Sequence, residues 1–177
     1  MPFFANAAKQ AGSKCIRTSS IRDVVEIKKA TGLPVIGLVK RVVEGYASYI
    51  TPTMQEVDEL VAAESDIVAL DCTMRERGDG TTINEFIAQI KEKYPDIVLM
   101  ADVSTFEEGV KARELGFDII STTLSGYTKH SRQDLTTPDF ELLEKLVNGN
   151  CTGIPVFLDL YAAKIIDKGT IASSPLM

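Results

Sequence analysis

Charged side chains follow short apolar runs at five places in this sequence. The five residues are Arg17, Lys40, Asp71, Asp102 and Asp159. If each run is a strand of one parallel sheet, these side chains meet at the edge formed by the carboxyl ends of the strands, where α/β proteins bind ligands. Converging cations and carboxylates suit a small, polar, anionic substrate. For any single residue, a surface ion pair is the alternative interpretation.

Lys40 is the residue best suited to chemistry. It follows the apolar residues 34–39, so we expect partial burial of its amine, which favours the neutral form. A neutral amine can abstract a proton or form an imine with a carbonyl group. Arg41 comes next and should point to the opposite side, since successive side chains of a strand alternate.

Carboxylates and hydroxyls offer hydrogen bonds around this lysine. Asp71 and Asp102 are expected to bind substrate hydroxyls or to hold Lys40 in place. Ser121 and Thr123 belong to a Ser-Thr-Thr run that has the same capacity, although hydroxyls at strand ends often bond to backbone instead. Residues 74–77 read Met-Arg-Glu-Arg, which is typical of a solvated loop; a mobile cationic lid is the alternative.

Several common kinds of site are not expected. No Gly-x-Gly-x-x-Gly motif follows a strand, and there is no P-loop. Cys15, Cys72 and Cys151 are far apart and not spaced as metal ligands, so we interpret them as reduced thiols. The single histidine, His130, supports neither a zinc site with these cysteines nor a serine–histidine triad.

Composition predicts one soluble domain. With 177 residues and 45% hydrophobic residues, the chain can fill a sizeable core. The formal net charge of -6 argues against a nucleic-acid partner. No apolar run is long enough to span a bilayer, and the first residues do not resemble a signal peptide. We therefore expect a cytoplasmic protein without a membrane partner.

Strand and helix patterns alternate along the chain. Strands are predicted over residues 14–17, 34–39, 66–73, 97–102, 118–123 and 153–159. Helices are predicted over residues 3–11, 21–30, 51–63, 82–94, 104–115 and 139–147. A loop or irregular hairpin is expected over residues 42–50. This βα alternation predicts a parallel sheet. Because a (β/α)₈ barrel typically needs about 250 residues, the sequence leaves two folds open, an open doubly wound sheet and an incomplete barrel.

Six short motifs together carry a family resemblance. They are PVIGLVKR (34–41), YITPT (49–53), EVDEL (56–60), ALDCT (69–73), ADVS (101–104) and STTLSGYT (121–128). In order and spacing, from about residue 5 to 155, the chain strongly resembles the N-acetylmannosamine-6-phosphate 2-epimerases of bacterial sialic-acid catabolism. The resemblance implies a TIM barrel that interconverts N-acetylmannosamine 6-phosphate and N-acetylglucosamine 6-phosphate without a cofactor or metal.

The resemblance also implies roles for individual residues. Lys40 matches the family's base at C2, Arg17 matches an arginine that contacts the substrate, and Asp102 matches an aspartate that binds sugar hydroxyls. Asp159 falls in register with the family's catalytic glutamate and is one methylene shorter.

Both ends of the chain depart from the family pattern. The family's first strand, with its substrate-binding glutamine, and its eighth strand, with its phosphate site, have no match. Residues 1–177 are thus expected to form a single, incomplete (β/α) barrel domain with an atypical tail over residues 160–177.

The main interpretation of the function is a sugar-phosphate epimerase. A truncated, catalytically inactive remnant and an imine-forming aldolase are the alternatives, and a homodimer stays open.

Overall fold

The computed structural model describes residues 1–149 and 154–157, in which six strands form one sheet. In chain order, which is also their order across the sheet, the strands are β1 (Ile16–Ser19), β2 (Val35–Leu38), β3 (Ile67–Asp71), β4 (Leu99–Asp102), β5 (Ile119–Ser121) and β6 (Val156–Phe157). The helices are α1 (Pro2–Gln10), α2 (Ile21–Thr31), α3 (Met54–Ala62), α4 (Ile83–Lys93), α5 (Phe106–Glu114) and α6 (Phe140–Asn148).

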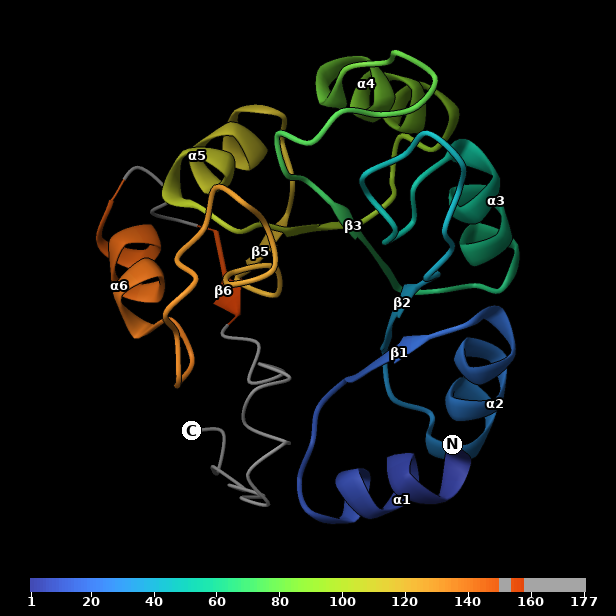
Figure 1. The fold of residues 1–177 in the computed structure, drawn as a ribbon. Helices are drawn as coiled ribbons and strands as arrows, with labels where there is room; N and C mark the ends of the chain where they lie inside the picture. Colours follow the sequence, from blue (N-terminus) through green and yellow to red (C-terminus); the bar gives the residue numbers. More distant parts are fainter. Residues whose placement is uncertain (150–153, 158–177) are drawn as a thin grey trace.

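The strand order identifies the kind of α/β fold. Every neighbouring pair of strands is parallel. Figure 1 shows α2 to α6 along the outside of a curved row of strands. A doubly wound sheet would instead reverse its strand order and carry helices on both faces. The fold is therefore a parallel α/β fold of the TIM-barrel type, which confirms one of the two folds that the sequence left open.

Local sequence signals set the ends of α2 and α3. Thr53 and Glu56 form a capping box at the start of α3, in which the Thr53 N–H donates to Glu56 Oε2 at 2.8 Å. Gly32 ends α2 in the left-handed conformation, with φ of 64°. Both signals are local, because each depends only on residues within a few positions of the helix end.

The cap of α5 lies one residue later than expected. The helix was predicted to begin at residue 104, but Thr105 and Glu108 form its capping box. The reason is that the buried Glu108 carboxylate serves several donors at once. It accepts from the Ser104 N–H and hydroxyl, both at 2.7 Å, and from the Met74 N–H at 3.0 Å.

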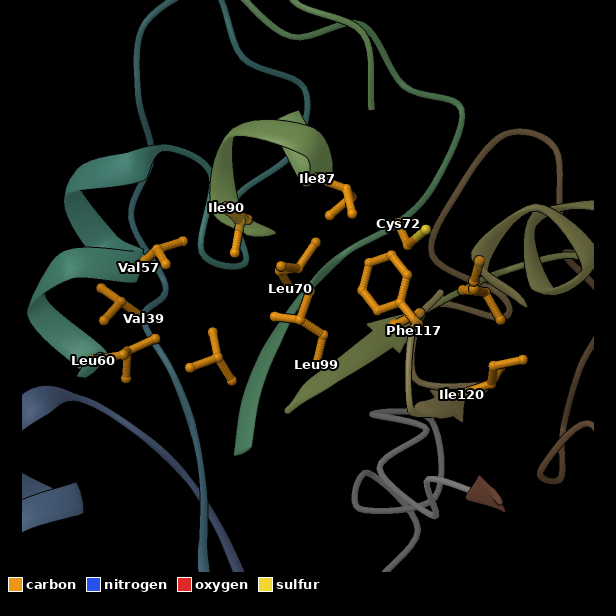
Figure 2. Packing of buried hydrophobic residues seen from close by; sticks show 14 of the residues in the cluster. Val39, Val57, Leu60, Leu70, Cys72, Ile87, Ile90, Leu99, Phe117 and Ile120 are labelled. Carbon is orange, nitrogen blue, oxygen red and sulfur yellow. The ribbon is translucent and has the colours of Figure 1, made fainter. Parts of the chain in front are cut away.

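Alternate residues of the strands face two different apolar groups. Val68, Leu70 and Leu99 belong to the larger group, which packs against the helices. Ala69 and Met100 belong to a smaller group on the inner face of the sheet. Figure 2 shows part of the larger group between the strands and α3 and α4. Burial on both faces explains why the strands read as continuous apolar runs.

Gly37 allows α2 and α3 to pack closely on β2. A Cβ atom at this position would lie 2.5 Å from Ser65 Oγ, 2.8 Å from Leu60 Cδ2 and 3.0 Å from Val24 Cγ2. The Gly37 N–H donates to the same Ser65 hydroxyl at 3.0 Å. The outer face of β2 therefore has no room for a larger residue here.

Residues 39–51 return antiparallel to the end of β2, and we refer to them as the 39–51 hairpin. Lys40 and Ile50 form a bridge, and the Thr51 N–H donates to the Val39 carbonyl at 2.7 Å. The Asp71 N–H of β3 donates to the Ile50 carbonyl at 3.1 Å. The hairpin thus lies between the carboxyl ends of β2 and β3, whose direct pairing stops before these residues.

The N-terminal region differs from the expectation in the position of its strand. β1 begins at Ile16 rather than at residue 14, so Arg17 is its second residue and not its last. Residues 1–15 contain α1, which packs against α2, and no strand. In the described part of the chain, all helices are too short or too polar to cross a membrane.

Candidate active site

The predicted site residues of the sheet share its inner face. The sheet register places Asp71 beside Asp102, and Asp102 beside Ser121. Each lies two residues beyond an inner-face side chain of its own strand. Arg17 lies beside Ile36, which also belongs to the inner face. Four side chains from four strands therefore point into the same interior.

Arg17 and Asp102 form an ion pair across this interior. Nη2 of Arg17 lies 2.7 Å from Oδ2 of Asp102, and Nη1 lies 2.9 Å from Sδ of Met100. The Asp102 side chain is fully buried, whereas the Arg17 side chain is 24% exposed. A buried carboxylate needs such a partner to offset its desolvation. The structure thus joins two of the predicted site residues.

Asp71 is paired with an arginine that the sequence placed in a solvated loop. The Arg75 guanidinium contacts Asp71 Oδ2, and Arg75 Nε donates to Thr73 Oγ1 at 2.9 Å. The Thr73 hydroxyl donates to Asp71 Oδ1 at 2.6 Å. The solvated-loop prediction for residues 74–77 is therefore wrong for Arg75, because the buried carboxylate of Asp71 holds its guanidinium inside.

Arg77 is also buried, and its contacts connect the loop after β3 to neighbouring parts of the fold. Its guanidinium lies 3.9 Å from the centroid of the Phe86 ring and donates to the Pro52 carbonyl. Burial lowers the pKa of Arg77 below its ordinary value. A Cβ atom on the adjacent Gly78 would lie 2.6 Å from the carbonyl carbon of Gly45. The loop thus packs tightly on the 39–51 hairpin, unlike the mobile lid considered from the sequence.

Lys40 lies two residues beyond the end of β2. The residue is exposed, and its side-chain nitrogen forms no ion pair within residues 1–149 and 154–157. The expected partial burial is therefore wrong. The bridge to Ile50 covers the backbone of Lys40 but leaves its side chain open to solvent.

Arg41 points away from the interior, as predicted. Its guanidinium contacts Glu56 and lies 3.1 Å from Oε2 of Glu59, and both carboxylates belong to α3. The Arg41 N–H donates to the Tyr49 carbonyl at 2.9 Å. The side chains of Lys40 and Arg41 therefore point in opposite directions. Of the two, only Lys40 faces the interior of the sheet where the other predicted site residues lie.

A cavity of about 530 Å³ connects the residues at this end of the sheet. Its lining includes Arg17, Lys40, Tyr49, Thr123 and Tyr127. The volume is typical of small-molecule sites. An amine, a guanidinium and several hydroxyls at one opening suit an anionic polyol, since the guanidinium can bind oxygen atoms while the amine moves a proton.

The two predicted hydroxyl residues lie together. Ser121 ends β5 and is buried, and its Oγ lies 2.8 Å from Oγ1 of Thr123. Thr123 also lines the cavity. The structure thus places this pair beside the Asp102 end of β4, with Thr123 facing the cavity.

Tyr49 is a cavity residue that the sequence analysis missed. The Arg75 guanidinium carbon lies over its ring, 5.7 Å from the centroid. The only feature of the sequence that points to Tyr49 is its position in the loop that follows Lys40. Its contact with Arg75 cannot be predicted from the sequence, because it joins two separate loops. Arg75 was missed for the same reason.

Two predictions lie outside the described residues. They are the second catalytic residue, Asp159, and the atypical tail over residues 160–177. Within residues 1–149 and 154–157, no group of three or more histidine, cysteine, aspartate or glutamate side chains is placed to hold a metal ion.

Comparison with protein families gives a match over most of the chain. The profile described as "Putative N-acetylmannosamine-6-phosphate epimerase" matches residues 1–169. The range matched by the profile extends beyond residue 155, whereas the motif resemblance in the sequence analysis ends there.

Individual relatives carry the same name. A "Putative N-acetylmannosamine-6-phosphate 2-epimerase" of Caldanaerobacter subterraneus is 48% identical over 97% of this chain and 74% of the relative. One of Clostridium perfringens is 50% identical over 81% of this chain and 63% of the relative. The solved structure of the N-acetylmannosamine-6-phosphate 2-epimerase from Clostridium perfringens superposes with a TM-score of 0.80 and 46% identity. It covers 88% of this chain, which spans 66% of that structure.

Proposed function

Because the chain belongs to the N-acetylmannosamine-6-phosphate epimerase family, we propose that it interconverts N-acetylmannosamine 6-phosphate and N-acetylglucosamine 6-phosphate. These sugars differ in configuration at C2, so the reaction removes and returns the C2 proton. The observation that carries the proposal is that Lys40 and Arg17 line one cavity at the carboxyl ends of the strands.

Lys40 is the proposed base. In the open-chain sugar, the C1 aldehyde makes the C2 proton acidic, because the electron pair left on C2 passes into the carbonyl as an enolate. The Lys40 amine takes the proton and becomes an ammonium. Return of a proton to the opposite face of C2 gives the epimer and restores the aldehyde. The reaction involves no net oxidation or reduction.

The neighbouring residues are proposed to bind the sugar. Arg17 contacts substrate oxygen atoms, and Asp102 holds its guanidinium at 2.7 Å while binding sugar hydroxyls. Ser121 and Thr123 add hydroxyl hydrogen bonds. We assign Asp71 an indirect substrate-binding role, because its carboxylate already accepts from Arg75 and from Thr73.

Asp159 is proposed to be the second acid or base, on the strength of its position in the sequence. It corresponds to a longer glutamate in the family pattern. A displacement of the reacting group by about 1 Å can cost on the order of a hundredfold in rate, so turnover slower than that of a glutamate-bearing relative is expected.

Deuterium exchange tests the proposed base. In deuterated water, turnover should place deuterium at C2, which proton NMR detects as loss of the C2 proton signal. Lys40→Ala should lower kcat by about a hundredfold or more, since a general base typically contributes 10²–10⁴-fold. Turnover that leaves C2 unlabelled would exclude proton transfer at this carbon.

Two controls separate this mechanism from the alternatives. Lys29→Ala removes an exposed lysine on α2 and should leave turnover unchanged. Treatment with borohydride in the presence of substrate should give no covalent adduct on Lys40, whereas an imine-forming aldolase would give one. The family membership of the chain supports the enzyme over the inactive remnant, for which complete absence of turnover is the expected result.

The remaining expectations about partners stay predictions. A sugar phosphate is the proposed small-molecule partner. A homodimer, the absence of a nucleic-acid partner and a cytoplasmic location rest on the sequence alone.

A further inference from the structure

The ring of Tyr49 is held in place by groups other than its hydroxyl. Its carbonyl accepts from the Arg41 N–H at 2.9 Å within the 39–51 hairpin. The ring is partly buried and packs against the inner apolar group, which includes Ile50. The Arg75 guanidinium, which is itself fixed to Asp71, lies over the ring. The orientation of the ring is thus set before any ligand binds.

The Tyr49 hydroxyl has no hydrogen-bond partner in residues 1–149 and 154–157. Tyrosine hydroxyls beside buried rings usually find such a partner. Tyr49 lines the cavity that also contains Lys40 and Arg17. Its hydrogen-bonding capacity is therefore open to a molecule in that cavity.

At neutral pH this hydroxyl is a donor. Burial raises the pKa of the Tyr49 phenol above its ordinary value, and the negative charges of Asp71 and Asp102 act in the same direction, against the lowering effect of Arg75. The protonated phenol can therefore donate its hydrogen to an acceptor atom of a ligand.

We propose that Tyr49 is a specificity-determining residue, whose hydroxyl donates a hydrogen bond to the acyl carbonyl oxygen of an N-acyl amino-sugar phosphate. The inference rests on the proposed function, which places C2 of the sugar at Lys40. The acyl amide is attached to C2, and Tyr49 lines the same cavity as Lys40. An amide carbonyl is also a stronger acceptor than a hydroxyl, whereas the phosphate lies at the far end of the sugar.

Binding of two inert ligands tests this assignment without turnover. The probes are 2-acetamido-2-deoxyglucitol 6-phosphate and glucitol 6-phosphate, which differ only at C2 and lack the aldehyde. Calorimetry should show that Tyr49→Phe weakens binding of the acetamido ligand about threefold to tenfold, the range for one neutral hydrogen bond. Binding of glucitol 6-phosphate should change less than about twofold, because its C2 hydroxyl is the poorer acceptor.

A matched variant controls for loss of a tyrosine hydroxyl. Tyr94→Phe makes the same change near the opposite end of the strands, where the Tyr94 hydroxyl donates to Asp58 at 2.8 Å. It should bind both ligands like the wild type. Equal losses for the two ligands in Tyr49→Phe, or no loss for either, would overturn the inference.

The binding readout also separates this inference from the proposed function. A wild-type chain that prefers the acetamido ligand through Tyr49 but does not epimerise would retain the inference and refute the activity. A chain that epimerises, but in which the Tyr49→Phe variant still prefers the acetamido ligand, would confirm the activity and refute the inference. A chain that binds neither ligand would overturn the inference, whereas the proposed activity is tested separately by turnover.

Discussion

Two buried carboxylates, Asp71 and Asp102, lie side by side at the ends of neighbouring strands. Like charges at this separation in a buried site are unfavourable unless each has a partner. Arg17 supplies one partner from β1, and Arg75 supplies the other from the loop after β3. The two ion pairs together offset the desolvation of both carboxylates at this end of the sheet.

Removal of Arg75 should therefore be costly. Arg75→Met leaves the Asp71 carboxylate buried without its ion-pair partner, and we expect a loss of about 3 kcal/mol in the free energy of unfolding. Urea denaturation measures this loss. The double variant Arg75→Met with Asp71→Asn should be more stable than the single one, because it also removes the unpaired charge. A double variant that is less stable than the single one would contradict this account.

At the scale of the element, α3 and α4 both begin with a Thr–Glu capping box, but the two glutamates lie in different surroundings. Glu56 of α3 is buried and contacts Arg41, whereas Glu85 of α4 is exposed and contacts only its own capping residue, Thr82, among the described residues. The α3 box therefore fixes a helix end and also the arginine that follows Lys40. The α4 capping box fixes only the end of its helix.

A matched pair of variants tests this difference. Glutamine retains the capping geometry but loses the charge. Glu56→Gln should lower the free energy of unfolding by about 1 kcal/mol, because it weakens a charged hydrogen bond to Arg41. Glu85→Gln should cost less than about 0.5 kcal/mol, as is usual for surface changes. Thermal unfolding of both variants measures the difference, and equal effects would be evidence against it.

Much of the arrangement of elements could be predicted because its signals are local. The runs that end in Asp71 and Asp102 stop being apolar where the strands end, so both residues were placed correctly. Arg17 was placed at a strand end because the apolar run before it is short, yet β1 continues through polar residues. Arg75 and Tyr49 could not be predicted, since their burial depends on contacts between separate loops.

At the scale of the whole molecule, stability should be unevenly distributed. β3 and β4 are buried on both faces, between the helices and the inner apolar group. In contrast, α1 packs against α2 and leaves Phe3 and Phe4 largely exposed, at 90% and 76%. The centre of the sheet and the first helix therefore differ in how much apolar contact opposes local opening.

Hydrogen–deuterium exchange with mass spectrometry checks this distribution. Amides of β3 and β4 should exchange slowest, at rates that approach those of global unfolding, and amides of α1 should exchange much faster. Exchange in α1 as slow as that in β4 would show that the first helix is part of the stable centre.

The 39–51 hairpin has a consequence for redesign of substrate preference. It occupies backbone hydrogen-bonding groups at the ends of β2 and β3, through Val39, Thr51, Ile50 and Asp71. Recognition of a substrate near the ends of β2 and β3 must then come from side chains rather than from exposed peptide groups. A library that varies Tyr49 and Thr123 could alter which C2 substituent is accepted while the backbone around Lys40 stays unchanged.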